Sequence, residues 1–490
     1  MSILKNKTFS LEQGSGMPFH YGLAFFFIVL GIKFWIISGF GSSVPYWDQW
    51  DAEADHLYRP FLDGSLRLSD LFAPHNEHRI LTTRVFGLGL LLLNKGVWDP
   101  MFEMYVNAVI HVSALLLLLV LMQKGLDDRL KLPFFAFASL FFGVPFGTEN
   151  TLAGFQLQFY LLLLFSFSLL WFVYRFDGAN WVRFILIAVL AFLSFFSVAS
   201  GALSLAAAAG LLLVRWITGV DRKISSLILV GILLVAFAVA VAYTPVLPHH
   251  ADLKAKNLGD FTIALWRASF GGVLYIPLIV FMVRQLINRP PANDQSWFIF
   301  SLGLWIFGQI FAISYGRAIG VLSSRYLDLF TIGILLNAYC LMLLYQQQYH
   351  MRIVKPALFL WMFIVVTTLG VITPRIMKDI AEKKAASQRY QDNVYGYLVA
   401  GDNTFLQKEP HTEIPYPHAL RLKSLLDNPV IAGILTPAVN GHNSNRGLLF
   451  YTERSRKVMS VVGSIMFFYG IALFLFDTLR KAGAGYEKEV

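Results

Sequence analysis

The segment HYGLAFFFIVLGIKFWIISGFG at residues 20–41 is followed directly by SSVPYWDQWDAEADHLYRP at residues 42–60. About 20 apolar residues are enough for a helix to cross the ~30 Å hydrocarbon core of a bilayer, so the first segment predicts a membrane span. A basic leader containing Lys5 and Lys7 precedes it, and no convincing small-residue cleavage site follows. We therefore expect a retained helix that leads into a polar site at one membrane surface.

The whole chain has the composition of a membrane protein. Hydrophobic residues make up 56% of its 490 residues, charged residues make up only 14%, and the mean hydropathy is +0.59. These values exclude an ordinary soluble globular protein. Much of the net charge of +10 lies in short loops, where membrane orientation and anionic lipid explain it without nucleic acid. Cys340 is the single cysteine, which excludes an intramolecular disulfide.

The composition and its patterning predict an all-α polytopic membrane protein. Apolar segments long enough to cross the bilayer recur along most of the chain. We predict about twelve transmembrane helices, at residues 20–41, 101–122, 133–147, 157–174, 180–198, 200–217, 224–244, 262–285, 296–315, 326–345, 355–373 and 458–478.

The distribution of Lys and Arg predicts the orientation of these spans. Every second short loop is basic, as with Lys124, Arg129 and Lys131, whereas the alternate turns at 148–156 and 197–201 carry no Lys or Arg. Basic loops remain on the cytoplasmic side of a membrane, so we expect both termini in the cytoplasm. The segments expected on the opposite, exported side are 42–100, 245–261, 315–325 and 374–457.

Two exported segments are long enough to hold structure of their own. Segment 42–100 has helical patterning at 52–62 and 82–93, and the second of these helices is too short to span, so we expect helices at the membrane interface. Segment 374–457 is polar and contains several prolines. The predicted organisation is a transmembrane core that includes the exported loop, then a small exported cap, then a final helix with a cytoplasmic tail, at residues 1–373, 374–457 and 458–490.

The first exported loop begins with a cluster of acids. Asp48, Asp51 and Asp55 share one face of a helix begun near Asp48, with Glu53 turned away. Desolvation raises the pKa of a carboxyl group near lipid, which suits such a group to accept a proton from a hydroxyl. The alternative is a solvated acidic loop, or a helix N-terminus capped by Asp48.

A second polar block, PHNEHR at residues 74–79, lies in the same loop. Arg79 or a histidine would meet an anionic group while Glu77 orients it, because Arg holds phosphate oxygens through paired donors. A metal bound by His75, Glu77 or His78 is the weaker interpretation, since the HExxH pattern is absent. A helix-start cluster at the lipid headgroups is the alternative. We expect no metal and no cofactor.

Shorter exported segments carry related groups. Glu149 and Gln156 lie in a turn between two spans, where acids and amides hold hydroxyl-rich ligands such as sugars, although a polar helix cap has a similar composition. Arg317 and Arg325, with Tyr326 next in sequence, form a candidate phosphate cradle. The alternative for these arginines is snorkelling to lipid headgroups.

Few ionisable residues lie inside the predicted spans. Lys33 is close enough to the exported end of its helix for its side chain to snorkel to the surface. His111 is a lone histidine that helix packing explains better than a ligand. On the exported side, His249 and His250 add further cations to segment 245–261.

The predicted topology and these polar motifs together resemble the GT-C superfamily of membrane glycosyltransferases. A first outward helix leads at once into an acidic motif, and a long polytopic body is followed by an exported C-terminal portion. Four short motifs look most similar to bacterial enzymes that use polyprenyl-phosphate sugars, including phage-type O-antigen glucosyltransferases: WDQWD at 47–51, the block at 74–79, the turn at 149–158, and SRY at 324–326.

The resemblance implies roles for particular residues. Asp48 would be the catalytic base, Asp51 its helper or a sugar ligand, and Arg317 or Arg325 the contact of the carrier phosphate. The paired acids typical of many members appear here as Asp48-Gln49 and Asp51, so the resemblance leaves open which aspartate is the base. The other substrate contacts expected are Glu53, His75, Glu77, His78, Arg79, Glu149, Gln156 and Tyr326.

The implied activity is inverting transfer of a sugar, with glucose as the expected sugar, from a polyprenyl-phosphate carrier to a glycan such as O-antigen or lipopolysaccharide. It would take place on the periplasmic face of a bacterial inner membrane. The expected partners are the donor, the glycan acceptor, membrane lipid, a flippase and a donor synthase. The alternatives are a transporter or flippase for a lipid-linked glycan, which predicts discontinuous helices and ionisable groups at mid-membrane, and an O-antigen ligase or polymerase, which predicts a main exported site late in the chain.

Overall fold

The computed structural model describes residues 19–486 apart from 179, 349 and 442–451, and this described part is helical without strands. Its longer elements are α1 (Phe19–Phe40), the π-helix η1 (Trp50–Tyr58), α2 (Arg59–Leu62), α3 (Leu68–Leu71), α4 (Leu81–Leu93), α5 (Pro100–Met122), α6 (Asp128–Gly143), α7 (Thr148–Thr151), α8 (Leu157–Tyr174), α9 (Trp181–Phe195), α10 (Ala202–Ile217), α11 (Ile224–Ala242), α12 (Leu258–Ala268), α13 (Ile276–Asn288), α14 (Ser296–Gly316), α15 (Ser324–Gln346), α16 (Met351–Ala400), α17 (Ala419–Leu426), α18 (Pro429–Ile434), α19 (Pro437–Asn440) and α20 (Thr452–Tyr486).

The long helices confirm a multi-pass membrane protein. Nine helices of the described chain are long and apolar enough to cross a bilayer, or ten if one bent pair counts as a single span. The nine coincide with predicted spans and are α1, α5, α8, α10, α11, α14, α15, α16 and α20. The predicted spans at 133–147 and 180–198 correspond to shorter helices, α6 with 16 residues and α9 with 15.

The bent pair corrects the expectation of a continuous helix at 262–285. Helices α12 and α13 meet at an angle of 61°. Between them, Phe270, Gly271 and Gly272 have φ values of 48°, 81° and 73°, a left-handed conformation in which an α-helix cannot continue. The consecutive glycines make this break possible, since glycine adopts positive φ without steric cost.

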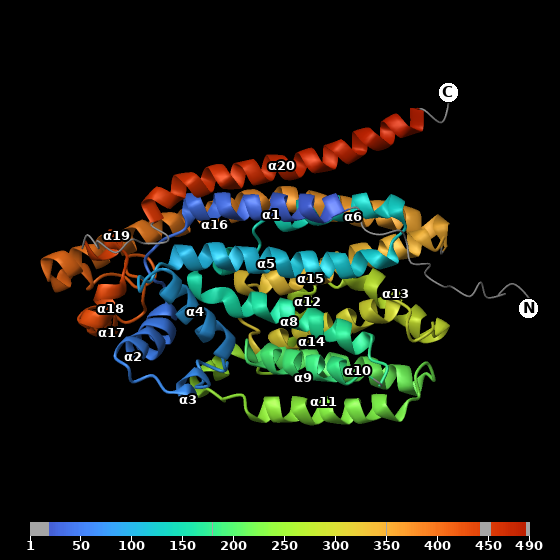
Figure 1. The fold of residues 1–490 in the computed structure, drawn as a ribbon, viewed down its shortest axis with the longest axis horizontal. Coiled ribbons are helices and arrows are strands. Elements are labelled where there is room, and N and C mark those ends of the chain that lie inside the picture. Colours follow the sequence, from blue (N-terminus) through green and yellow to red (C-terminus); the bar gives the residue numbers. More distant parts are fainter. Residues whose placement is uncertain (1–18, 179, 349, 442–451, 487–490) are drawn as a thin grey trace, which may run out of the picture.

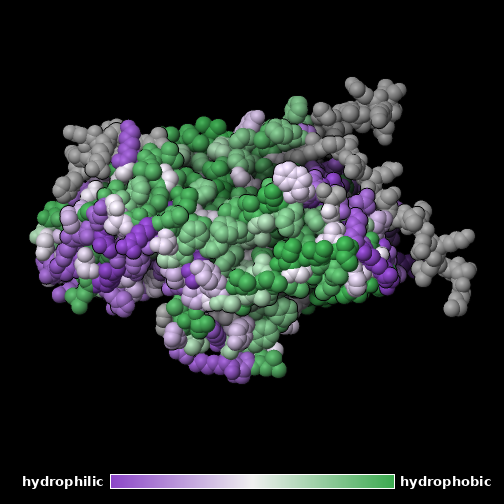
Figure 2. Space-filling view, turned by 60° about the horizontal axis from the view of Figure 1, so that its bottom comes forward, coloured by the Kyte–Doolittle hydropathy of each residue, from purple (hydrophilic) through white to green (hydrophobic). Residues whose placement is uncertain are grey.

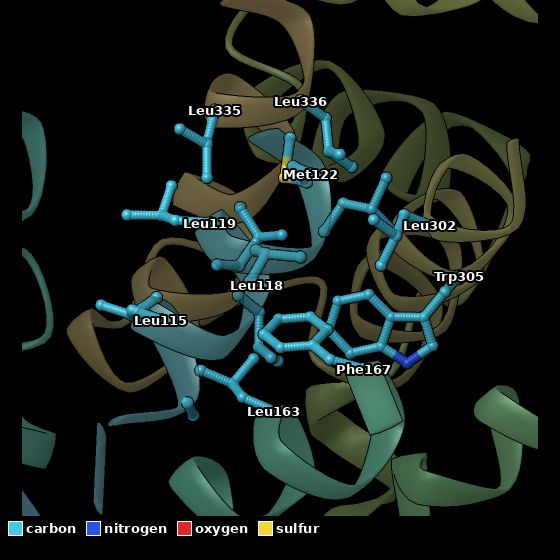
Figure 3. Packing of buried hydrophobic residues seen from close by; sticks show 14 of the residues in the cluster. Leu115, Leu118, Leu119, Met122, Leu163, Phe167, Leu302, Trp305, Leu335 and Leu336 are labelled. Atoms are coloured by element: carbon cyan, nitrogen blue, oxygen red, sulfur yellow. The ribbon is translucent and has the colours of Figure 1, made fainter. Parts of the chain in front are cut away.

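The bundle core is apolar and lies between helices distant in sequence. Leu118 of α5 lies beside Phe167 of α8 and Trp305 of α14 in Figure 3, whereas Leu115 and Leu119 extend from the other side of α5, and all of these side chains are buried. Dispersion contacts between such closely packed side chains, rather than the hydrophobic effect, hold helices together within lipid.

Glycines bring the first and last spans into close contact. A Cβ atom on Gly31 would lie 2.5 Å from the carbonyl oxygen of Gly463, and one on Gly470 would lie 2.8 Å from the carbonyl oxygen of Ala24. Small residues at these positions allow the backbones of α1 and α20 to approach. The two helices run in opposite directions, so α1 begins and α20 ends at the same end of the bundle (Figure 1).

The predicted exported segments gather at one end of the bundle (Figure 1). The Arg79 guanidinium of the first loop lies 3.6 Å from the ring centre of Tyr243, and Glu77 pairs with Arg317. Basic loops lie at the other end, where the Arg284 side chain bonds the Gln347 side chain at 2.6 Å. Figure 2 shows an apolar belt between two hydrophilic ends on the face in view. The grouping of loops into two sides is therefore as predicted.

The first loop and the C-terminal segment, both predicted to be exported, form one body with a shared core, which is called the exported body after that prediction. Trp50 and Trp98 from the loop side pack in the same buried cluster as Tyr390 and Ile414. Helix α16 has 50 residues, or ~75 Å of helix, about two and a half times the ~30 Å thickness of the hydrocarbon core. It runs without interruption through the predicted boundary at 373/374 and extends from the span that precedes α20 into this body.

Lys33 does not snorkel to the surface as expected. Its side chain is buried, with 5% of its area exposed, and its Nζ donates a hydrogen bond to Thr151 Oγ1 at 3.1 Å. The Lys33 side chain stays buried because the short helix α7 lies next to it and supplies the Thr151 hydroxyl. His111 stacks on Tyr160 with ring centres 4.1 Å apart, in agreement with the packing role expected for it.

Candidate functional site

A cavity of about 800 Å³ lies at the end of the bundle where the segments predicted to be exported gather. Its walls come from the chain after α1, the turn between α6 and α8, the start of α15, the outer half of α16 and a loop of the C-terminal segment. The side chains that line it are Tyr46, Trp47, Asp48, Thr148, Glu149, Ala153, Phe155, Gln156, Ser324, Arg325, Asp379, Glu382, Lys383, Ala385, Ala386, Arg389, Tyr390, His411 and Thr412.

Asp48 reaches this cavity because the chain turns sharply after α1. Trp47 has a φ of 53°, a strained value for a bulky residue, and its N–H donates to the Pro415 carbonyl at 2.9 Å. The Asp48 side chain is 32% exposed and lies 3.8 Å from His75 Nε2. The carboxylate is thus open to a ligand, beside an imidazole that is positioned by packing against Phe155.

Arg325 and Glu149 stand together at the cavity wall. Arg325 Nη2 lies 2.6 Å from Glu149 Oε1, and Asn150 Nδ2 donates to the Arg325 carbonyl at 2.9 Å. The buried Nε of Arg325 has no hydrogen-bond partner within the protein. Ser324 Oγ accepts the backbone N–H of Glu149 at 3.2 Å. Two candidate substrate contacts predicted in separate segments of the sequence, Glu149 and Arg325, thus lie together in one cavity wall.

Helix α16 supplies residues that sequence reasoning missed. Lys383 Nζ lies 5.5 Å from the ring centre of Tyr46, and Arg389 Nε donates to the Thr412 carbonyl at 2.8 Å. The stretch 375–400 contains no proline and a single glycine, Gly396. That composition is the signal for a helix continuing beyond the membrane, which would have placed these cations opposite Asp48.

Aromatic rings form another part of the cavity wall. Trp47 stacks on His411 with ring centres 4.0 Å apart and an angle of 27°. Tyr46 stacks on Tyr390 with ring centres 5.8 Å apart. The site thus combines acids, cations and aromatic faces, the groups that orient a hydroxyl-rich ligand bearing an anionic group.

Glu77 and its partners form a second polar cluster near Asp48. Glu77 pairs with Arg317 and lies 2.9 Å from His250 Nδ1, so the charge of Arg317 is already compensated. Burial lowers the pKa of His78 to about 3, with a further contribution from His75. His78 is therefore neutral near pH 7, and its Nδ1 lies 3.4 Å from the backbone nitrogen of Ala199.

Arg79 and Tyr326 lie outside the cavity lining. The guanidinium of Arg79 donates to the Phe72 carbonyl at 2.9 Å and stacks over Tyr243, which holds two exported segments together. Tyr326 packs edge-on against Phe159, with ring centres 6.4 Å apart. Gln156, by contrast, is part of the cavity lining.

Asp51 and Asp55 share one partner, Arg421, whereas Asp48 does not lie on a common helix face with them as predicted. Asp51 accepts hydrogen bonds from the Tyr416 hydroxyl at 2.5 Å and from Arg421 at 3.1 Å. Asp55 contacts the same arginine at 2.5 Å. Glu53 is turned away as predicted, but into the interior, where it is 4% exposed. The π-helix η1 begins at Trp50, so Asp48 precedes it and points elsewhere.

Comparisons with family models, with curated proteins and with solved structures found no match to this chain.

Proposed function

We propose that this protein is a membrane glycosyltransferase of the GT-C type, which moves a sugar from a polyprenyl-phosphate carrier to a glycan acceptor on the exported side. The main observation in support of the proposal is that Asp48 and Arg325 line the same cavity. Asp48 follows the first span closely, and Arg325 lies in the first turn of α15. A base and a phosphate-binding group at the ends of spanning helices suit a donor whose phosphate lies in the headgroup plane.

In the proposed reaction, Asp48 takes the proton of the acceptor hydroxyl as its oxygen bonds to the anomeric carbon. The bond from that carbon to the carrier phosphate oxygen breaks, and the electron pair leaves with polyprenyl phosphate. Arg325 and Lys383 stabilise the departing anion. Direct displacement inverts the anomeric centre. The protonated Asp48 then returns its proton to water.

The contact pattern also refines the roles implied by the resemblance. Asp48 forms no ion pair with Lys or Arg in the described chain, whereas Asp51 is bound to Tyr416 and Arg421. A general base must have a lone pair available to its substrate. We therefore assign the base to Asp48, and assign Asp51 to holding the exported body together.

Glycan profiling in cells tests the proposal directly. Cells with the gene should carry a sugar on an envelope glycan that cells without the gene lack, and Asp48→Asn should fail to restore it at normal expression. Arg222→Gln, at the basic end of the bundle and outside the cavity, serves as a control and should restore the sugar. Identical glycans in all four strains would remove the proposal.

A further inference from the structure

Two buried acids form a closed polar cluster with Gln49, the residue next to Asp48. Glu53 and Glu103 are each 4% exposed, and Gln49 is 1% exposed. The Gln49 Nε2 donates to Glu53 Oε2 at 2.8 Å and to Glu103 Oε2 at 3.0 Å. The Tyr58 hydroxyl donates to Glu103 Oε1 at 3.1 Å. These carboxyl groups do not line the cavity, and the proposed reaction does not use them.

The cluster holds two carboxyl groups without a compensating cation. In the described chain, neither Glu53 nor Glu103 pairs with Lys or Arg, and the other groups facing them are Tyr58, Trp98 and, for Glu103, Asp99. Burial raises the pKa of Glu53 to about 8. Two acids that share one amide donor away from water do not both ionise near neutral pH.

The same cluster fixes both cavity walls next to Asp48. The Gln49 Oε1 accepts the backbone N–H of Tyr46 at 3.2 Å, which closes the turn that contains Trp47 and Asp48. On the other side, a Cβ atom on Gly154 would lie 2.0 Å from Glu103 Oε2. The absence of a side chain at Gly154 therefore lets the acid pair meet the segment that leads to the cavity.

We propose that Glu53 and Glu103 hold a buried proton between them and act, through Gln49, as positioning residues for Asp48. While the proton is present, the Gln49 amide can bond both acids and the Tyr46 backbone at once. When the proton leaves, two adjacent negative charges repel each other and loosen this arrangement. The positioning role rests on the proposed function, whereas the buried proton does not.

Thermal unfolding of the purified protein between pH 5 and pH 9 tests whether the buried proton is present. The pKa of Glu53 is about 8 in the folded chain against an ordinary 4.5, so folding takes up a proton between these values. The folded state must then lose stability as pH rises from about 4.5 to about 8, with no further loss above. Glu53→Gln removes this pH dependence. The Tm of this variant minus the Tm of wild type should therefore increase with pH up to about pH 8 and stay constant above it.

Glu103→Gln should behave in the same way, and Glu409→Gln, an exposed acid elsewhere in the exported body, should follow wild type at every pH. Infrared titration of the wild type needs no variant and should show a protonated carboxyl band that fades through about pH 8. A pH-independent Tm difference for both acid variants, or the absence of that band at pH 7, would overturn the buried proton.

The positioning role is tested by turnover with a synthetic polyprenyl-phosphate sugar. Gln49→Met should lower kcat about 10-fold or more with little change in KM, because slight misplacement of a catalytic group is costly. Glu103→Gln mimics the protonated acid and should keep kcat within about twofold at pH 7, and it should lack the alkaline fall in activity that the proposal predicts for wild type. Wild-type kcat and pH profiles in both variants would overturn positioning. An inactive wild type would instead remove the proposed function, and the unfolding data would still decide the proton.

Discussion

Arg317 and Arg325 are alike in sequence but have different surroundings. Arg317 pairs with Glu77 and lies 3.4 Å from His250 Nδ1. Arg325 lines the cavity, and its Nε has no hydrogen-bond partner within the protein. Arg325 is also paired, with Glu149, but it lines the cavity, where its remaining donors can meet an anion, whereas Arg317 lies outside the cavity lining. The geometry therefore favours Arg325 as the carrier-phosphate contact.

Arg325→Lys should raise the KM for a polyprenyl-phosphate sugar about 10-fold, because lysine keeps the charge but loses the paired donors. Arg317→Lys is the matched control and should leave KM within about twofold. Steady-state kinetics on the purified variants measures both. Equal KM values for the two variants would show that Arg325 has no special role.

The candidate site residues were predictable where polar side chains flank an apolar span. Asp48, Glu149 and Arg325 are at such positions, because the end of a span must lie at the membrane surface. Lys383 was not predictable in this way, since it lies far beyond its span within a polar segment. The burial of Glu53 was also not predicted. It depends on Gln49, four residues earlier, and on Glu103 of α5, which Gln49 also contacts.

At the scale of elements, η1 is fastened to the C-terminal segment by a charged network. Arg421 at α17 contacts Asp51 and Asp55 of η1, and Arg59 lies 2.6 Å from Asp55. The contact from Tyr416 to Asp51 joins residues 365 positions apart. Sequence periodicity gives no information about such long-range pairings. The helices were therefore predictable, but their packing into one exported body was not.

Arg421→Met should destabilise the exported body by about 1 kcal/mol, a value discounted for screening because the Arg421 side chain is 39% exposed. The change leaves Asp51 and Asp55 close together with Arg59 as the remaining cation. Thermal unfolding and limited proteolysis of the purified protein would measure the effect. Lys423→Met, on the same helix but in contact with Asp427 and the Tyr397 ring instead of η1, should change the Tm less. A smaller effect for Arg421→Met than for Lys423→Met would contradict the fastening role.

At the scale of the whole molecule, the alternation of basic and non-basic loops predicted which segments share an end of the bundle. The break between α12 and α13 was not recognised, because hydropathy averaged over a span does not register three left-handed residues. Helices α6 and α9, with 16 and 15 residues, are shorter than a full membrane span. The number of spans was therefore predicted less well than the grouping of the loops. Local composition thus predicted the grouping better than the path of each helix.

Cysteine labelling tests the orientation of the bundle. In spheroplasts, a membrane-impermeant maleimide should label Lys408→Cys in the exported body and should not label Arg129→Cys, since both positions are exposed but lie at opposite ends. The native Cys340 is buried and provides the unlabelled background. Labelling of position 129 without position 408 would reverse the predicted orientation.

The most direct test of the central claim is sugar transfer by purified protein from a labelled polyprenyl-phosphate sugar to a glycan acceptor. If Asp48 is the base, Asp48→Asn should lower kcat by about 10²- to 10⁴-fold while the protein remains folded and binds donor. Asp51→Asn is the matched control and should have a milder effect, because the Asp51 carboxylate is bound to Tyr416 and Arg421. Full transfer by Asp48→Asn at wild-type stability would contradict the assignment of this site as catalytic.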